Sequence, residues 1–240
     1  MKPPHTVILA GGKGTRLMPF TVTFPKPLVP VGDKPILEIL LGQLHRSGIE
    51  EVTLTLGHLS ELIRAFINQH INTAMAPMNI NCVVEAEPTG TAGSLRLVPG
   101  LTDTFLVMNG DLLTNLDFND LIGYHKAHGA ELTIATHTNR VQIDFGVLEL
   151  DDAGRLVDYI EKPEKEYRVS MGVYVYEPSV LELIPPGRYF DFPALVLEML
   201  RLKRPVATYP FDGIWLDIGR PEDYARAQEL YEEREGDFLK

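Results

Sequence analysis

The sequence has almost no cysteine and no long apolar run. Its single cysteine, Cys82, excludes an internal disulfide and a cysteine-based metal cluster, and we expect its side chain to be a small buried hydrophobe. No window approaches the roughly 18 consecutive apolar residues of a membrane span, and the N-terminal residues show no signal-peptide cleavage site. We therefore expect a cytoplasmic protein without a membrane partner.

Positive charge is also scarce, because 22 lysine and arginine residues stand against 33 aspartate and glutamate residues, for a net charge of -11. A protein that binds nucleic acid needs a basic face, so no nucleic-acid partner is expected. The first 34 residues depart from this balance, with five cationic side chains and one acidic side chain, Asp33. A basic segment in an acidic chain indicates a local site for a small anion.

The pattern of apolar residues predicts an α/β fold in one domain of 240 residues. Apolar runs of strand length occur at residues 6–10, 52–56, 81–85, 105–109 and 132–137. Helix-like patterns or loops separate the first four. Strands that alternate with helices predict a mostly parallel sheet with helices on both faces.

Helix boundaries can be read from capping residues. Pro35 is expected at the first position of a helix whose core-facing residues are Ile36, Leu37, Leu40, Leu41 and Leu44. Ser60 is expected to cap a second helix that buries Leu62, Ile63, Phe66 and Ile67. Asp117 is expected to cap a third helix that runs to about Gly129, with His125 and His128 facing solvent.

After Gly129 the pattern favours antiparallel pieces: a hairpin around residues 152–154, a long alternating strand over RVSMGVYVYE, a helix from about Phe192 to Leu202 and a final helix from Pro221. The acidic tail from about Glu232 is expected to be frayed.

The loop after the first strand, LAGGKGTRLMPFTVTFPKPL at residues 9–28, combines glycines, cations and prolines. Glycines let backbone N–H groups approach a phosphate closely. The Walker pattern does not fit this loop, and the dinucleotide fingerprint fails because Leu17 stands at the position of its third glycine. We interpret it as a long, proline-stiffened loop that holds Arg16 and Lys26 over an anion.

The segments GGKGTRL at 11–17 and PKPL at 25–28 resemble the signature of the sugar-1-phosphate nucleotidyltransferases, also called NDP-sugar pyrophosphorylases. Further segments match this family in order along residues 7–224. They are EPTGTAGSL at 87–95, MNGD at 108–111, FGVLEL at 145–150, EKP at 161–163, SMGVYVY at 170–176 and WLDIGRPEDY at 215–224.

The resemblance implies a three-layer α/β/α sandwich of the nucleotide-diphospho-sugar transferase type, with a nucleotide-binding half at about 1–130 and a sugar-phosphate half at about 131–230. It implies transfer of a nucleoside monophosphate from an NTP to a sugar 1-phosphate, with release of pyrophosphate. Arg16, Lys26 and Asp111 would be catalytic, and Asp111 and Asp217 would hold Mg²⁺. The nucleotide would contact Leu9, Gly11, Gly12, Gly14, Thr15, Glu87, Gly90 and Thr91, and the sugar phosphate Gly146, Glu161, Lys162 and Gly172.

Several alternatives stay open at this point. A lone aspartate at a strand end is more often a turn or cap residue than a metal ligand. Glu161 and Lys162 could form a salt-bridged hairpin end, and Asp191 could be a helix N-cap instead of a sugar contact. EPTGTAGSL favours the mannose-1-phosphate guanylyltransferase-like members, with GTP and a mannose or heptose type of sugar, over UTP, dTTP or CTP and another hexose 1-phosphate. A non-catalytic regulatory subunit that binds nucleotide sugar is the alternative of a different class, and the oligomeric state is open, a homo-oligomer included.

Overall fold

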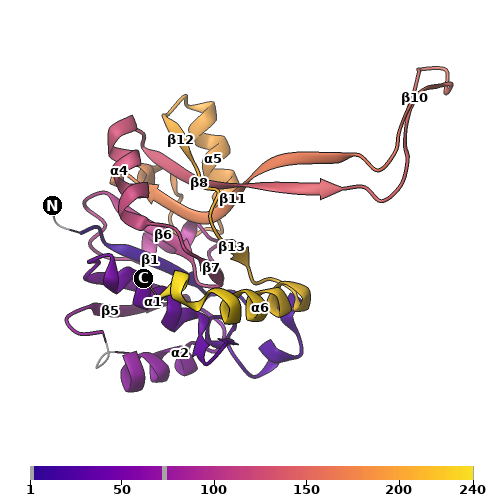
Figure 1. The fold of residues 1–240 in the computed structure, drawn as a ribbon. Coiled ribbons are helices and arrows are strands. Elements are labelled where there is room, and N and C mark those ends of the chain that lie inside the picture. Colours follow the sequence, from indigo (N-terminus) through magenta and orange to yellow (C-terminus); the bar gives the residue numbers. More distant parts are fainter. Residues whose placement is uncertain (1–2, 72–74, 240) are drawn as a thin grey trace.

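A central sheet of seven strands organises the chain (Figure 1). The structure is a computed structural model and describes residues 3–71 and 75–239. The strand order is β12-β8-β11-β6-β1-β4-β5, and only β11 runs antiparallel to its two neighbours in the described sheet. The bounds are β1 (Thr6–Ala10), β4 (Glu51–Leu56), β5 (Asn79–Val84), β6 (Phe105–Asn109), β8 (Leu132–Gln142), β11 (Glu164–Tyr176) and β12 (Val206–Pro210). The predicted mixed, mostly parallel sheet is confirmed.

Helical segments cover both faces of this sheet and complete the expected three layers. One face packs against α1 (Ile36–Arg46), α2 (Ser60–Phe66), α4 (Phe118–His128) and α6 (Pro221–Phe238). The other face packs against α5 (Phe192–Arg201) and the 3-10 helices η5 (Gly93–Leu97) and η6 (Pro178–Leu183). Because side chains alternate along a strand, Val7 and Ile8 of β1 enter the two opposite cores. No described helix is long and apolar enough to cross a membrane.

The predicted helix boundaries are partly right. The five apolar residues expected on α1 are fully buried, and the helix starts one residue after Pro35. Asp117 caps α4 as expected, since its Oδ1 accepts hydrogen bonds from the N–H groups of Asn119 and Asp120.

The prediction for α2 is wrong at its N-terminus. Leu59, at φ 57°, is the N-cap, and Ser60 is already helical. This start turns Ile63 and Ile67 into the core and leaves Leu62 42% exposed. The chain continues from α2 into a short π-helix, η4 (Ile67–Ile71).

Two expectations about the surface, a frayed acidic tail and a solvent-facing His125, differ from the structure. The acidic C-terminal tail belongs to α6, where Phe238 is buried and stacks on Tyr231 at a ring-centroid distance of 5.7 Å. His125 is also buried, and its Nδ1 and Nε2 lie 2.8 Å from Thr133 Oγ1 and 3.1 Å from Glu177 Oε1. Glu177 lies directly after β11, so tertiary packing supplies the partner that makes burial of the imidazole tolerable.

The burial of His125 predicts a specific dependence of stability on pH. Desolvation lowers the pKa of the imidazole, although Glu177 partly opposes this effect. His125 therefore takes up a proton near pH 6.5 in the unfolded chain but only at lower pH in the folded chain. As the pH falls below about 6.5, proton binding to the unfolded chain lowers the free energy of unfolding. We expect the free-energy advantage of the wild type over His125→Gln, measured by urea unfolding, to shrink from pH 7.5 to pH 5.5. A constant difference across this range would contradict the prediction.

The expected hairpin exists, but it lies at the end of a long projection (Figure 1). β8 and β11 stay paired beyond the sheet, from Thr136 with Ser170 to Gln142 with Glu164. They carry the antiparallel pair β9 (Val147–Leu150) and β10 (Leu156–Ile160), which is joined through Gly154 at φ 76°. We call residues 138–168 the arm.

Candidate active site

The long loop after β1 folds into three short 3-10 helices, η1 (Thr15–Leu17), η2 (Phe20–Val22) and η3 (Lys26–Leu28). Leu17, Pro27 and Leu28 are buried and fix the loop to the core below it. The Thr21 hydroxyl donates a hydrogen bond of 2.7 Å to the carbonyl of Gly14, which ties the glycine-rich part to the proline-rich part. The loop thereby holds the Lys26 side chain, which is 11% exposed, over the end of the sheet.

Lys26 contacts two carboxylates from distant parts of the chain. Its Nζ forms a short ion pair with Asp111 Oδ2 and lies 3.8 Å from Asp217 Oδ1. A small sheet of β7 (Leu112–Thr114) and β13 (Trp215–Asp217) brings these carboxylates together, because its register pairs Asp217 with Leu112. The N–H of Ile218 also donates to the Asp111 carbonyl at 3.1 Å. The structure therefore brings Lys26, Asp111 and Asp217 together at one place.

The two aspartates provide oxygen atoms suited to a divalent cation. Asp111 Oδ1 is buried and accepts no hydrogen bond from the described residues. Desolvation, and then the negative charge of Asp111, raise the pKa of Asp217, while Lys26 and Arg16 lower it. No group of three or more metal-ligating side chains occurs in the described chain, so at most two carboxylates are available here. Mg²⁺ is commonly held by one or two carboxylates together with phosphate oxygens, and this donor set fits that pattern.

The raised pKa of Asp217 predicts that this residue lowers stability. Because folding favours its protonated form, stability falls as the pH rises from about 4 through the raised pKa. We expect Asp217→Asn to raise the thermal unfolding midpoint at pH 7 by less than about 4 °C, a small change because the side chain is half exposed and screened. The difference should vanish at low pH, where both side chains are neutral.

Differential scanning fluorimetry between pH 4 and pH 7.5 measures this effect. Asp212→Asn is the matched control, since Asp212 is exposed and lies on the loop before the same strand. A midpoint for Asp217→Asn at or below that of the wild type at pH 7 would contradict the prediction.

A cavity of about 660 Å³, which we call the glycine-loop pocket, opens at the carboxyl ends of β1, β4, β5 and β6. Open α/β sheets place their ligands at this edge. Five of the predicted residues line the pocket, along with Asp111: Leu9, Gly11, Gly12, Gly90 and Thr91. Lys13 lines it as well.

A second cavity of about 320 Å³, which we call the tryptophan pocket, adjoins the first. Its lining includes Gly172, Trp215 and Asp217, and it shares Thr91 and Asn109 with the glycine-loop pocket. The Trp215 Nε1–H donates a hydrogen bond of 2.9 Å to the Met171 carbonyl, which fixes the indole against this pocket. Asp111 lines the glycine-loop pocket and Asp217 lines the tryptophan pocket, and Lys26 bridges these two carboxylates at what we call the junction of the pockets.

The loop that contains Gly90 is held from the opposite half of the chain. The Phe190 carbonyl accepts hydrogen bonds from the N–H groups of Ala92 and Gly93 at 3.1 and 2.8 Å. Gly90 has φ 85°, and a Cβ there would lie 2.6 Å from the same carbonyl. Glycine is therefore required for the loop to close against this segment. Asp191 is the N-cap of α5, as one of the two interpretations of this residue predicts.

The remaining predicted residues lie at varied positions. Arg16 is exposed, and its Nη2 would lie 3.4 Å from a Cβ at Gly219, on the Asp217 side of the cleft. Gly14 and Thr15 belong to the same loop but do not line either pocket. Glu87 is exposed outside the pocket lining.

Three predicted residues lie on the arm, and the structure does not bring them to the cleft. They are Gly146, Glu161 and Lys162. Glu161 accepts a hydrogen bond of 2.8 Å from the Tyr159 hydroxyl, and neither Glu161 nor Lys162 has a salt-bridge partner among the described residues.

Several lining residues are absent from the predicted site, and among them are Glu85, Asn109 and Trp215, which carry polar groups that a ligand could contact. Glu85, two positions before the predicted Glu87, lines the glycine-loop pocket, and its Oε2 accepts hydrogen bonds from the N–H and hydroxyl of Thr89. Asn109 and Trp215 line the tryptophan pocket. A usable signal existed for Glu85 and Asn109, since both lie at the carboxyl end of a predicted strand, where this fold places ligands.

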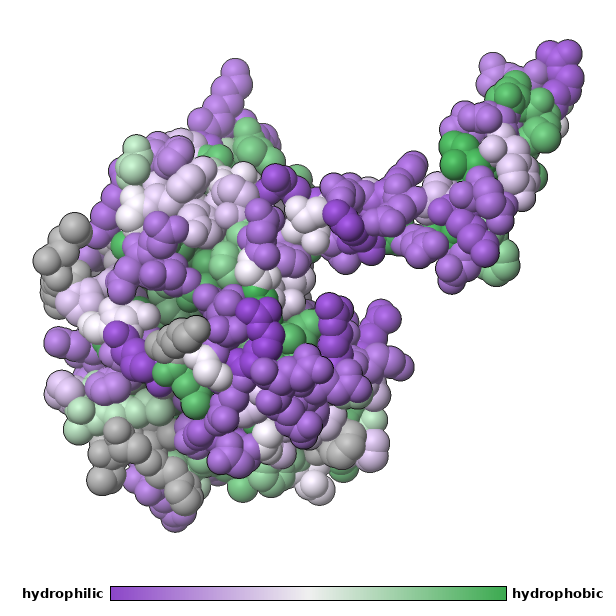
Figure 2. Space-filling view, viewed as in Figure 1, coloured by the Kyte–Doolittle hydropathy of each residue, from purple (hydrophilic) through white to green (hydrophobic). Residues whose placement is uncertain are grey.

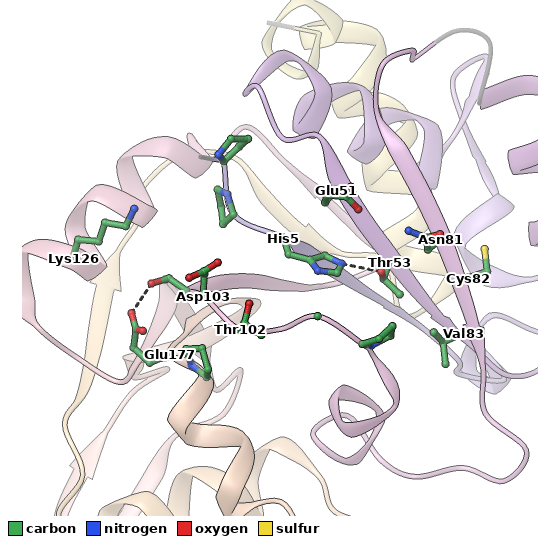
Figure 3. A pocket seen from close by; sticks show the side chains of 16 residues that line it. His5, Glu51, Thr53, Asn81, Cys82, Val83, Thr102, Asp103, Lys126 and Glu177 are labelled. Carbon is green, nitrogen blue, oxygen red and sulfur yellow. Dashed lines mark hydrogen bonds between the residues drawn. The ribbon is translucent and has the colours of Figure 1, made fainter. Parts of the chain in front are cut away.

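A larger cavity, of about 840 Å³, lies at the opposite edge of the sheet. Figure 3 shows it between His5, Glu51, Thr53, Asn81 and Glu177, which lie near the amino ends of β1 and β4 or in neighbouring segments. None of the residues predicted for catalysis lines it. Size alone therefore does not identify the candidate active site.

The sheet order and the paired pockets at its carboxyl edge define an α/β protein of the nucleotide-diphospho-sugar transferase fold. The chain belongs to the nucleotidyl transferase family, whose family model matches residues 5–234. The family membership predicted from the loop motif is thus confirmed.

Named relatives and solved structures agree with this assignment. The chain is 34% identical to a UTP–glucose-1-phosphate uridylyltransferase of Synechocystis, over 92% of this chain and 61% of the relative. It is 33% identical to a mannose-1-phosphate guanyltransferase of Schizosaccharomyces pombe, over 94% of this chain and 63% of the relative. The chain therefore spans less than two thirds of the length of these relatives. The crystal structure of HddC from Yersinia pseudotuberculosis aligns with a TM-score of 0.72 at 26% identity, over 95% of this chain and 99% of that chain.

Proposed function

We propose that this protein transfers a nucleoside monophosphate from an NTP to a sugar 1-phosphate and releases pyrophosphate. One observation carries the proposal: Lys26, Asp111 and Asp217 meet at the junction of two pockets, one beside a glycine-rich loop and one beside Trp215. Two polyanionic substrates that react with each other need cationic charge at the point where they meet. In the reaction, a sugar phosphate oxygen attacks the α-phosphorus in line, and the bond to the β-phosphate oxygen breaks.

The chain's own residues can perform the positioning that this reaction requires. Backbone N–H groups of Gly11 and Gly12 can contact the triphosphate in the glycine-loop pocket. Lys26 can exchange its carboxylate partners for the α-phosphate and the attacking phosphate, since its Nζ already lies at the junction. Arg16 can bind the β- and γ-phosphates, because its planar guanidinium suits phosphate geometry.

Asp111 and Asp217 would hold Mg²⁺, which would neutralise phosphate charge and polarise the α-phosphoryl group. Nucleotidyltransferases of this family generally use a divalent metal. Two observations support this assignment. Asp111 Oδ1 is buried without a hydrogen-bond partner among the described residues, and a cation could bind it. The pKa of Asp217 is raised, and a nearby cation would stabilise its ionised form.

GTP with a mannose or heptose type of sugar 1-phosphate is our preferred substrate pair. The mannose-1-phosphate guanyltransferase relative and a structural neighbour, HddC complexed with GMP-PN at 25% identity, support this preference. UTP with glucose 1-phosphate is the alternative, since the uridylyltransferase relative is equally similar.

Pyrophosphate release tests the proposal directly. Purified protein with Mg²⁺ is assayed with GTP, UTP, dTTP and CTP against the 1-phosphates of mannose, glucose, glucosamine and heptose, and Asp111→Ala serves as the inactive control. We expect release with one preferred pair and none from the variant. No release from any pair, together with retained binding of nucleotide sugar, would instead support a non-catalytic regulatory protein.

A further inference from the structure

The arm makes its interactions within itself. The hydrogen bonds and ion pairs described for residues 138–168 join residues of the arm to one another, as in Arg140 with Glu166 and Asp151 with Arg155. Figures 1 and 2 show the arm extending away from the body of the molecule. A two-stranded ribbon without a covering surface is at best marginally stable in water. The fold of one chain therefore leaves the arm without the cover that would stabilise it.

The hairpin of β9 and β10 at the end of the arm carries an apolar face. Leu148 and Leu150 on β9 pair with Tyr159 and Leu156 on β10, so the four side chains share one face of the ribbon, and each is 55–59% exposed. Phe145, just before β9, is 78% exposed. Figure 2 shows hydrophobic residues gathered on this projecting part. An exposed apolar face of this kind indicates an interaction site.

The end of the arm is also acidic. Residues 145–160, which we call the arm tip, hold four acidic side chains and one cationic side chain, Arg155. Two arm tips would therefore repel each other, which disfavours pairing of one arm tip with another. The surface that covers the apolar face should instead combine apolar side chains with net positive charge.

The helix α5 offers an uncovered apolar side on the body of the protein. Only Glu198 and Arg201 among its ten residues are charged. Leu197 and Leu200 lie on the same side of the helix and are 67% and 57% exposed, and Leu202, directly after the helix, is 43% exposed. A helix that is apolar on its outer side as well as on its core side is usually buried on both. The exposure of these leucines shows that the described part of the chain does not cover the outer side of α5.

The surroundings of α5 have the charge that complements the arm tip. Residues 188–204, which include α5, hold four cationic and two acidic side chains in a chain whose net charge is -11. Three of these cations, Arg188, Arg201 and Lys203, are exposed. The arm tip and the outer side of α5 are thus complementary in charge, and both expose apolar side chains.

The arm tip is held away from the α5 of its own chain. β11 runs in unbroken register with β8 from the pair Ser170 and Thr136 to the pair Glu164 and Gln142. At about 3.3 Å per residue, this ladder spans about 20 Å. Folding the tip back onto its own body would require breaking the ladder. The complementary surface is therefore accessible to the arm tip on a second copy of the chain.

We propose that two copies of this chain form a dimer in which the apolar face of each arm tip packs on the outer side of α5 of the other copy. The exchange is reciprocal, so twofold symmetry closes the dimer and covers both arms. Each copy contributes the five exposed apolar side chains of its arm tip and the three exposed leucines at α5. At on the order of 100 Å² each, these eight side chains supply the roughly 800 Å² per partner of a stable interface. None of them lines the glycine-loop pocket or the tryptophan pocket, so the dimer is tested without an activity assay.

The first test is the mass of the protein in solution, measured by light scattering after size-exclusion chromatography. The wild type should be a dimer. Leu148→Ser/Leu150→Ser in the arm tip and Leu197→Ser/Leu200→Ser in α5 should each be monomers with unchanged circular dichroism spectra, because all four side chains are exposed in the single chain.

Two single variants are the matched controls. Glu149→Ser lies on the opposite face of β9, and Leu62→Ser removes an exposed leucine of α2, on the other face of the sheet. Both should remain dimers. A monomeric wild type, or a dimer that survives the change in the arm tip or in α5, would overturn the proposal. A mass that grows beyond that of a dimer with concentration would show a contact that does not close, and would overturn the twofold dimer.

The second test asks whether the arm tip of one copy lies against α5 of the other. Cys82, the only cysteine, is first replaced by alanine. Leu150→Cys chains and Leu197→Cys chains with different tags are then co-expressed and treated with a short bismaleimide. The cross-linked species should contain both tags, because one arm cysteine meets one α5 cysteine only in the mixed dimer. A dimer without cross-links between unlike chains would exclude α5 as the surface that covers the arm.

Discussion

Lys26→Met is expected to lower kcat/KM for pyrophosphate release by about 10²–10³-fold, the typical cost of removing one preorganised group that stabilises developing charge. The reason is positional: Lys26 Nζ contacts Asp111 and lies 3.8 Å from Asp217, at the junction of the two pockets, and its side chain is 11% exposed. Methionine keeps the length and apolar part of the side chain but carries no charge.

The same variant should respond more strongly to metal. Without Lys26, the carboxylates of Asp111 and Asp217 repel each other with less compensation, so Mg²⁺ should raise the thermal unfolding midpoint more in the variant than in the wild type. Lys34→Met is the matched control, because Lys34 also lies within 3.7–3.8 Å of two carboxylates, Asp33 and Glu235, outside the cleft. Activity of Lys26→Met within tenfold of the wild type would exclude Lys26 from the proposed role.

Asp111→Asn is expected to reduce activity on the order of 10³-fold, because it removes a charged oxygen ligand from a site that offers two carboxylates. The change is nearly isosteric, and it preserves the hydrogen bond that the Ile218 N–H donates to the backbone carbonyl of residue 111. The fold should therefore remain intact while the affinity for Mg²⁺ falls.

Two measurements separate this role from a structural one. Steady-state rates titrated with Mg²⁺ should show a higher metal requirement for the variant, and the stabilisation of the wild type by Mg²⁺ with NTP should be lost. Asp103→Asn is the control, since Asp103 lies just before β6, at the other end of the strand that Asp111 follows. Equal loss of activity in both variants would point to damage to β6 instead of to the metal site.

The sequence predicted the charged residues between the two pockets better than the other residues that line the pockets. Lys26, Asp111 and Asp217 lie in segments with distinctive local patterns, so a single sequence was enough to select them. Asn109 and Trp215 lie in the same two motifs as Asp111 and Asp217, and Glu85 lies at a predicted strand end, but only the alignment of strand ends and the pairing of β7 with β13 place these three residues on the pocket walls.

Burial was predicted well on regular elements and poorly where distant segments decide it. The apolar face of α1 follows from helical periodicity alone. His125 is polar and was expected in solvent, yet Thr133 and Glu177 from β8 and the end of β11 give its ring hydrogen-bond partners inside the protein. Phe238 is buried in a tail expected to be frayed, because α6 packs against the core on one face of the sheet.

By itself, the sequence determined the alternation of strands and helices, the parallel character of the sheet and the family, because these depend on periodicity and on short local motifs. Only the tertiary structure decided that Asp217 faces Asp111, that two pockets meet at Lys26, and that β8 and β11 continue as an arm away from the body. The physical reason is that strand pairing joins residues about 100 positions apart, such as Leu112 and Asp217, and local sequence carries no record of such a register.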